Sequence, residues 1–278
     1  MKKVFYPEAI LICLFTFLLF LPIYSHLLGR FGARESYYSH GYLVPFVIAY
    51  LVFRKQNRLK EIEALGIFSG LIILLTGIVL YLASLFLKSN FTAYLSLPLV
   101  ILGVLLYLKG KKFTKELLFP LAFLFFMLPL PEFMIIGISF KLKILAAQLA
   151  TNLGNLIGIK AILSGSTIFY PGGTLLVGDP CSGLRSLITF LALGALFTQF
   201  TKASSIQKVS LFLSAIPIAI ISNLLRLTFL LLVGFVYGQE AITGLVHDIS
   251  GYLVFVLGFL GLILASKILK CKLAVENI

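Results

Sequence analysis

The sequence predicts an all-α integral membrane protein, a polytopic bundle of about eight transmembrane helices. Hydrophobic residues make up 60% of the 278 residues and charged residues only 12%, with a mean hydropathy of +1.08. A soluble domain carries roughly 25% charged residues, so much of this apolar surface must face lipid. Long apolar runs recur along the chain, and lysines and arginines gather at their ends, which is the pattern of membrane-spanning helices.

Eight apolar runs are candidate spans. The first follows Lys2 and Lys3 and resembles a signal peptide, but no small-x-small cleavage site follows, so we interpret it as an uncleaved span. The second is short for a membrane crossing. No internal repeat or linker divides the chain, which predicts a single transmembrane domain over residues 1–278. The candidate spans are residues 9–28, 41–53, 66–87, 91–108, 117–130, 183–200, 209–237 and 245–268.

Two segments between the fifth and sixth runs do not look like spans. Residues 133–159 have helical character but carry Lys141, Lys143 and several amide side chains. This polarity predicts an interfacial or re-entrant helix packed against the bundle. Residues 161–177 are punctuated by Gly, Ser and Pro, and alternation around residues 170–173 predicts a small extracytoplasmic hairpin.

The distribution of basic residues tests this topology. Cytoplasmic loops are enriched in Lys and Arg. If the N-terminus is cytoplasmic and residues 133–179 stay outside, 15 of the 23 basic residues fall on the cytoplasmic side. If residues 133–159 crossed fully, the lysines after the sixth span would move outside, so the charges favour eight spans over nine. The 15 residues are Lys2, Lys3, Arg54, Lys55, Arg58, Lys60, Lys109, Lys111, Lys112, Lys115, Lys202, Lys208, Lys267, Lys270 and Lys272.

The same charges argue against nucleic acid as a partner. The net charge is +13, but the basic residues end apolar runs and form no aromatic-basic groove. Of the three cysteines, Cys13 and Cys271 lie in an apolar run and a basic tail, and no CxxC pair exists. No metal or nucleotide motif appears, so we expect neither a metal nor a cofactor. Only Cys181 has a polar, Gly-rich setting.

Three residues are candidates for chemistry at the outer face. Cys181 precedes the sixth span, where helix-terminal amides favour a thiolate. Arg226 lies about 27 Å along a helix from Lys208, near the outer boundary, and an arginine within an apolar run is a functional candidate. Asn223 shares its helical face. His247 begins the eighth span and can exchange a proton near neutral pH.

Each of these residues also has a structural interpretation: a buried thiol, an arginine snorkelling to headgroups, and an interfacial histidine. Their shared predicted depth favours function. A cysteine and a histidine supply a nucleophile and a proton-transfer partner. An arginine can stabilise a carbonyl oxyanion or bind a carboxylate.

Five strings in the chain resemble the exosortases, within the exosortase/archaeosortase group of membrane transpeptidases. The resemblance implies that Cys181, Arg226 and His247 are the catalytic residues, and that Arg185 matches a frequent family arginine. Archaeosortases carry an arginine where this chain has His247, so the bacterial exosortase branch is favoured. The matching strings are residues 39–55, 128–133, 171–187, 221–230 and 247–255.

The resemblance implies a cysteine endopeptidase or transpeptidase of the bacterial cytoplasmic membrane, with its active site on the extracytoplasmic side. Its partners would be membrane lipids, an unknown acceptor, and secreted proteins that end in a sorting motif, often Pro-Glu-Pro, a span and a basic tail. Two alternatives remain open on the residues alone. One is a component of lipid or polysaccharide transport in which Arg226 and His247 bind an anionic headgroup, and the other is a lipid acyltransferase.

Overall fold

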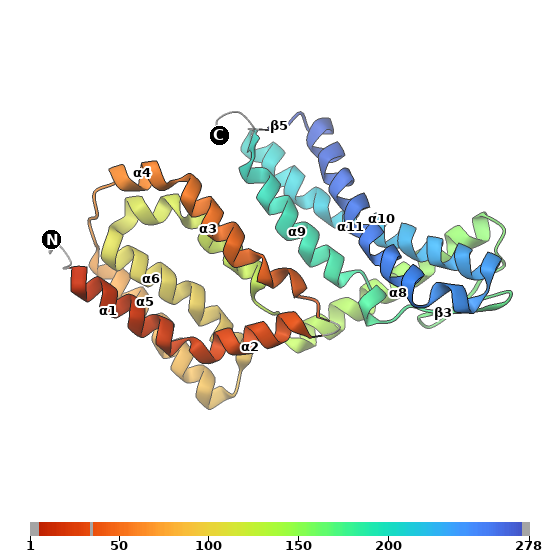
Figure 1. Ribbon diagram of the computed structural model, residues 1–278, viewed down its shortest axis with the longest axis horizontal. Coiled ribbons are helices and arrows are strands. Elements are labelled where there is room, and N and C mark those ends of the chain that lie inside the picture. The colour runs from red at the N-terminus through yellow and green to blue at the C-terminus, as the bar shows by residue number, and fades with distance from the viewer. Residues whose placement is uncertain (1–5, 34–35, 274–278) are drawn as a thin grey trace. The chain divides into compact units, whose positions relative to one another are not determined.

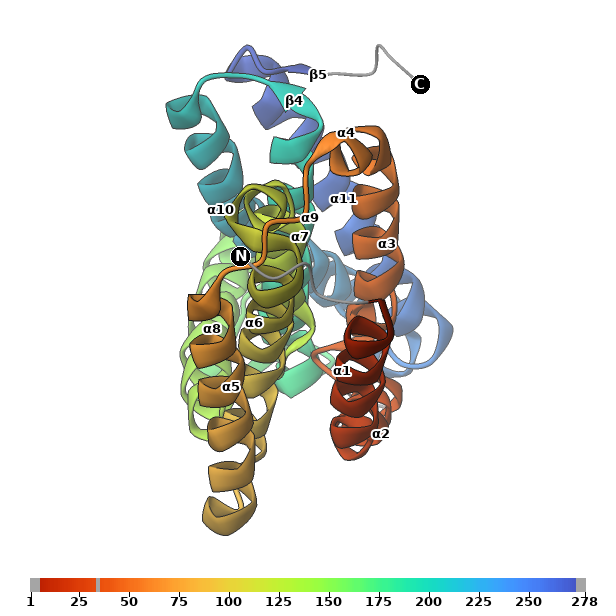
Figure 2. The same cartoon turned by 90° about the vertical axis from the view of Figure 1, so that its left-hand side faces the viewer.

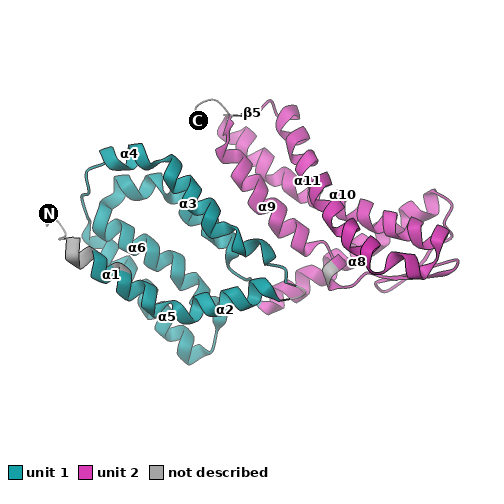
Figure 3. Ribbon diagram, viewed as in Figure 1, with its two compact units in different colours: residues 1–131 teal, residues 132–278 magenta. Residues whose placement is uncertain are grey.

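The computed structural model describes residues 6–33 and 36–273, and the fold is predominantly helical, as the sequence predicts (Figure 1). The chain divides into two compact units, residues 1–131 and residues 132–278 (Figure 3). Lys2 and Lys3, which the charge argument places in the cytoplasm, lie outside the described residues.

Unit 1 consists of helices joined by short connections. Its elements are α1 (Tyr6–Leu19), α2 (Leu21–Gly32), the 3₁₀ helix η1 (Ser39–Tyr42), α3 (Val44–Arg54), α4 (Gln56–Glu61), α5 (Phe68–Leu87), α6 (Asn90–Glu116), α7 (Leu118–Phe123) and the 3₁₀ helix η2 (Leu124–Met127).

The antiparallel pair α5 and α6 packs through glycines (Figure 2). A Cβ atom at Gly103 would overlap the backbone of Leu74, and one at Gly70 would overlap the backbone of Tyr107. Small residues allow membrane helices to approach this closely. Ser89 begins α6, and its hydroxyl accepts a hydrogen bond from the Thr92 amide at 3.4 Å, which satisfies one of the unpaired amides of the helix terminus.

Two long-range hydrogen bonds fix η1 beside η2. His40 Nε2 lies 2.9 Å from the carbonyl oxygen of Phe126, and the Leu130 amide donates to Tyr38 Oη at 2.9 Å. Burial lowers the pKa of His40 against an opposing effect of the Phe126 carbonyl, so we expect a neutral imidazole at neutral pH.

Unit 2 contains four long helices and two small sheets. Its elements are α8 (Glu132–Leu156), β1 (Ile162–Ser164), β2 (Thr167–Tyr170), β3 (Gly173–Leu176), the 3₁₀ turn η3 (Asp179–Cys181), α9 (Leu184–Gln199), β4 (Thr201–Lys202), α10 (Ser205–Tyr237), the 3₁₀ helix η4 (Gln239–Ile242), α11 (Leu245–Ile268) and β5 (Lys272–Leu273).

Helices α9, α10 and α11 pack together and are joined at one end. There β4 pairs antiparallel with β5, and Gln207 Nε2 donates to the carbonyl oxygen of Leu269 at 2.9 Å (Figure 2). A reciprocal capping box between Ser204 and Gln207 begins α10 at this end. The lysines of this end, which the sequence analysis assigns to the cytoplasm, therefore share one end of the three-helix bundle: Lys202, Lys208, Lys267, Lys270 and Lys272.

The segment predicted as a hairpin is a three-stranded antiparallel sheet in the order β1-β2-β3. Strands β2 and β3 pair across the turn at residues 171–172, where the sequence analysis placed the hairpin, and β1 adds a third strand. Tyr170 packs directly on Gly234, where a Cβ atom would collide with the phenol oxygen. The sheet is thereby docked on the last third of α10.

Judged by length and composition, fewer than the predicted eight helices qualify as membrane spans. Among the described residues five helices are long and apolar enough to cross a membrane, namely α5, α6, α8, α10 and α11. The pair α1 and α2, bent by 51°, adds a sixth if it forms one span. The other three predicted spans are shorter: α9 has 16 residues, α3 has 11, and residues 117–130 contain only α7 and η2, which together cover Leu118–Met127. At 1.5 Å per residue, α9 covers only about 24 Å of a hydrocarbon core of about 30 Å.

Helix α8 also differs from the prediction. The sequence analysis classed residues 133–159 as interfacial or re-entrant, whereas α8 meets the criterion for a span. Helix α8 has 25 residues and a mean hydropathy of 1.7 over its most apolar window, and three of its polar side chains have partners within the protein. Lys143 pairs with Asp179 at 2.9 Å, Thr151 donates to the Ala147 carbonyl, and Asn155 exchanges two hydrogen bonds with the Ala161 backbone.

We expect Gly103→Ala to destabilise unit 1 by roughly 1–3 kcal/mol, because the methyl group would press on the Leu74 backbone. The matched control is Gly29→Ala in α2, where nothing lies within 4 Å of the added carbon. Thermal unfolding in detergent should show a lower Tm for Gly103→Ala and an unchanged or higher Tm for Gly29→Ala. Equal Tm values would contradict this account of the α5–α6 contact.

Candidate active site

Cys181 lies in the turn η3, two residues before Gly183, the N-cap of α9. The Cys181 amide donates to the Gly178 carbonyl at 3.0 Å, and the Ser182 hydroxyl donates to the Asp179 carbonyl at 2.7 Å. Gly183 has a φ of 88°, a conformation that favours glycine, and it redirects the chain into α9. These local bonds hold the cysteine in a tight turn.

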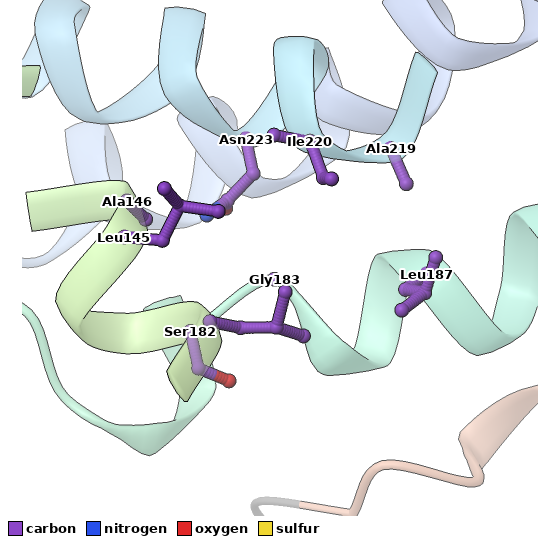
Figure 4. Close-up of a pocket in the computed structure, with 9 residues that line it drawn as sticks. Leu145, Ala146, Ser182, Gly183, Leu187, Ala219, Ile220 and Asn223 are labelled. Carbon is purple, nitrogen blue, oxygen red and sulfur yellow. The ribbon is translucent and has the colours of Figure 1, made fainter. Parts of the chain in front are cut away.

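Asn223 of α10 anchors this turn from the opposite side. Its Nδ2 donates to the Cys181 carbonyl at 3.0 Å, and the residue is only 4% exposed. A Cβ atom at Gly183 would lie 3.0 Å from the same Nδ2, so glycine also leaves room for the amide. Figure 4 shows Asn223 projecting from α10 toward the turn.

A cavity behind the turn, between α8, α9 and α10, has a volume of about 20 Å³ (Figure 4). Ser182, Gly183 and Asn223 contribute to its lining. This volume suffices for one water molecule. The cavity is too small for a peptide, so a substrate must reach Cys181 from another side.

The structure brings together the three residues that the sequence selected as candidates. Cys181 Sγ lies 3.9 Å from His247 Nε2, and Arg226 Nη2 lies 3.2 Å from the same nitrogen. Cys181 and Arg226 are 6% and 8% exposed, whereas His247 is half-buried at the beginning of α11. The group is therefore accessible mainly through the imidazole.

Arg226 is a buried cation whose contacts are all to neutral acceptors. Its Nε donates to Ser250 Oγ at 3.1 Å, and its Nη2 donates to the His247 carbonyl at 3.5 Å as well as facing Nε2. The ion pairs identified within residues 6–33 and 36–273, Lys55–Glu116 and Lys143–Asp179, do not include it. A buried guanidinium without a carboxylate is unfavourable unless negative charge develops beside it.

The nitrogen Nε2 has one lone pair and two neighbouring donors. Because a guanidinium only donates hydrogen bonds, its contact with Nε2 requires a neutral imidazole with its proton on Nδ1. The thiol of Cys181 faces the same lone pair at the longer distance. The positive charge of Arg226 also opposes a second positive charge on His247.

The remaining sequence candidates occupy different positions. Arg185 lies in the first turn of α9, and its Nε is buried without a hydrogen-bond partner among the described residues. Sequence reasoning missed Ser250, although its position three residues after His247 on a helix could have indicated it.

Within the described ranges, no group of three or more His, Cys, Asp and Glu side chains is placed to hold a metal ion. The site consists of a thiol, an imidazole and a guanidinium, supported by an asparagine and a serine.

The fold and this site define a multi-pass membrane protein with a cysteine–histidine–arginine centre. The chain belongs to the transmembrane exosortase family, whose family model matches residues 32–264 and thus most of the chain. This match confirms the resemblance found in the sequence and includes every residue of the site. Searches of curated proteins and of solved structures returned no match.

Replacing Asn223 by alanine should loosen the cysteine turn, because it removes the donor on the Cys181 carbonyl. We expect the reaction of Cys181 with a small methylating thiol reagent to accelerate severalfold, since the buried thiol would become accessible more often. The control is Thr228→Ala in the same helix, because among the described residues the Thr228 hydroxyl bonds to the Leu224 carbonyl of α10 and to no residue of the turn. Equal reaction rates, followed by mass spectrometry, would show that Asn223 does not hold the turn.

Proposed function

We propose that this protein is a membrane-embedded cysteine endopeptidase and transpeptidase acting on C-terminal sorting signals of secreted proteins. The observation that carries the proposal is the buried Arg226, which has no carboxylate partner in the part of the chain that the structure describes and contacts His247 beside the Cys181 thiol. Such a guanidinium is suited to a negative charge that appears only during reaction. Membership of the transmembrane exosortase family supports this class of chemistry.

The first half-reaction forms a thioester. The substrate carbonyl oxygen takes a hydrogen bond from Arg226 Nη2, which releases the lone pair of His247 Nε2. The imidazole then accepts the Cys181 proton while the sulfur attacks the carbonyl carbon. Arg226 stabilises the tetrahedral oxyanion, and the C–N bond breaks as Nε2 returns its proton to the leaving amine.

The second half-reaction releases the new C-terminus. An acceptor amine, or water, loses a proton to His247 Nε2 and attacks the thioester. The oxyanion again lies beside Arg226, and its collapse breaks the C–S bond and regenerates the Cys181 thiol. A substrate span held beside α9, α10 and α11 would align the scissile bond with the thiol.

We place the active site on the extracytoplasmic side of a bacterial cytoplasmic membrane. The support is the three-helix bundle of unit 2, which carries its lysines at the β4–β5 end and Cys181, Arg226 and His247 toward the other end. Helix α11 has 24 residues and spans about 36 Å. If the basic end is cytoplasmic, the cluster lies at the opposite surface.

This placement retains the topology of eight crossings with α8 as an additional helix outside. From Ser205 to Arg226 α10 covers about 32 Å, close to one hydrocarbon thickness. Buried residues of the second half of α8, among them Ala150, pack in one core with Leu227 and Leu231, beyond Arg226. That half of α8 would therefore accompany the part of α10 that projects from the membrane.

The catalytic proposal is tested with a secreted reporter that ends in Pro-Glu-Pro, a hydrophobic span and a basic tail. Cys181→Ala should reduce its cleavage by at least about a thousandfold, because the thioester cannot form. Cys271→Ala is the matched control, since this buried thiol lies at the opposite end of the bundle and should leave cleavage unchanged.

Cleavage that survives Cys181→Ala would sink the proposal. A transport component would instead tolerate Cys181→Ser and lose transport with Arg226→Ala. A lipid acyltransferase would form a thioester on Cys181 with a lipid acyl chain and leave the reporter intact.

The orientation has a separate test. Because Cys181 and Cys271 are both buried, new cysteines at exposed positions are more informative than the native thiols. In a background without native cysteines, Glu240→Cys in η4 should react with a membrane-impermeant maleimide on intact cells. Glu61→Cys at the end of α4, in the basic loop assigned to the cytoplasm, should react only after lysis. The reverse pattern would place the site in the cytoplasm.

A further inference from the structure

Ser250 joins the guanidinium of Arg226 to the backbone of His247. Its hydroxyl accepts a hydrogen bond from Arg226 Nε at 3.1 Å and donates to the His247 carbonyl at 2.6 Å. The residue is 0% exposed, so water cannot replace either bond without a rearrangement. The single hydroxyl of Ser250 therefore uses its proton to bind His247 and a lone pair to bind Arg226.

We propose that Ser250 is a positioning residue that fixes the orientation of the Arg226 guanidinium. The expected effect of Ser250 on catalysis rests on the proposed function. Its effect on the orientation of the guanidinium does not depend on that function. A guanidinium is planar, so a hydrogen bond on Nε determines where both Nη groups point. With Nε held by Ser250, Nη2 is directed at His247, where a substrate carbonyl oxygen must also bind.

Ser250 contacts neither the thiol nor a reacting atom, so its effect is exerted through Arg226. Without the hydroxyl, the buried Nε would lose its acceptor. The guanidinium could then rotate toward the remaining acceptor, the His247 carbonyl, which Nη2 already approaches at 3.5 Å. Such a rotation would withdraw Nη2 from the position that an oxyanion requires.

The chain offers a matched control in the same helix. Ser266 of α11 is 2% exposed, and its hydroxyl donates to the Ile263 carbonyl at 2.8 Å, three residues earlier, as Ser250 does to His247. Among the described residues, no arginine bonds to Ser266. The two serines therefore share helix, burial and local bond, and differ in the contact with Arg226.

The experiment compares Ser250→Ala with Ser266→Ala in the full chain in detergent. The first measurement is modification of Arg226 by phenylglyoxal, followed by mass spectrometry, which needs no catalytic activity. Ser250→Ala should accelerate this modification severalfold, because the guanidinium loses the bond that holds it, whereas Ser266→Ala should not. Equal rates in the two variants would overturn the proposal whether or not the reporter is a substrate.

The second measurement is reporter cleavage. Ser250→Ala should lower kcat roughly ten- to a hundredfold with KM nearly unchanged, the size expected for one hydrogen bond to a charged group. Ser250→Thr should restore most of the rate, because threonine keeps the hydroxyl. Loss of cleavage in both alanine variants, in proportion to a lowered Tm, would indicate a structural role and contradict the inference. If the unmodified protein cleaves no reporter, the proposed function fails and the phenylglyoxal result still decides the role of Ser250.

Discussion

The unpaired positive charge of Arg226 is the constraint on which the site of this protein depends. A guanidinium that is 8% exposed normally requires a carboxylate, but here its partners are a hydroxyl, a carbonyl and an imidazole nitrogen. The surrounding structure supplies these partners from one turn of α11. Residues 247 and 250 of α11 therefore supply the hydrogen-bond partners of a side chain on α10. The cluster forms only if the two helices lie in the correct register.

Contacts along the bundle hold α10 and α11 in place, partly through α9 and the turn before it. At one end, β4 pairs with β5, and Gln207 of α10 donates to the carbonyl of Leu269, the C-cap residue of α11. At the other end, Asn223 joins α10 to the turn that carries Cys181. Between them, Gly258 accepts the ring of Phe190, where a Cβ atom would collide with the aromatic carbons. A close helix contact in the middle and bonds at both ends keep three chemically unrelated side chains at one depth.

The sequence predicted the fold class and the members of the cluster more successfully than the number of spans. Arg226 could be found because its distance from Lys208 along a helix places its positive charge near the outer boundary of the membrane. This argument needs only the rise of a helix and the hydropathy of the sequence. The number of spans stays a prediction, because hydropathy does not distinguish a short helix such as α9 from a full crossing. Composition also does not show that Lys143 of α8 has a partner in Asp179, so the polarity of this helix alone does not decide whether it crosses the membrane. Ser250 was missed because serine is common in membrane helices, and only its contact with Arg226 distinguishes it.

The sharing of one imidazole nitrogen between an arginine and a thiol has a consequence for chemical durability. Thiolates, and not thiols, are the species that oxidise to sulfenic acid, and exposed cysteines of low pKa are the most vulnerable. If the site lies on the extracytoplasmic side, as we propose, no glutathione pool repairs such damage. Cys181 is only 6% exposed, and the imidazole nitrogen beside it also contacts Arg226, so both access to the thiol and the base that would deprotonate it are restricted. In the proposed mechanism, the contact between Arg226 and His247 delays the reaction until a substrate carbonyl binds. The same contact would also protect the Cys181 thiol from oxidants before the substrate arrives.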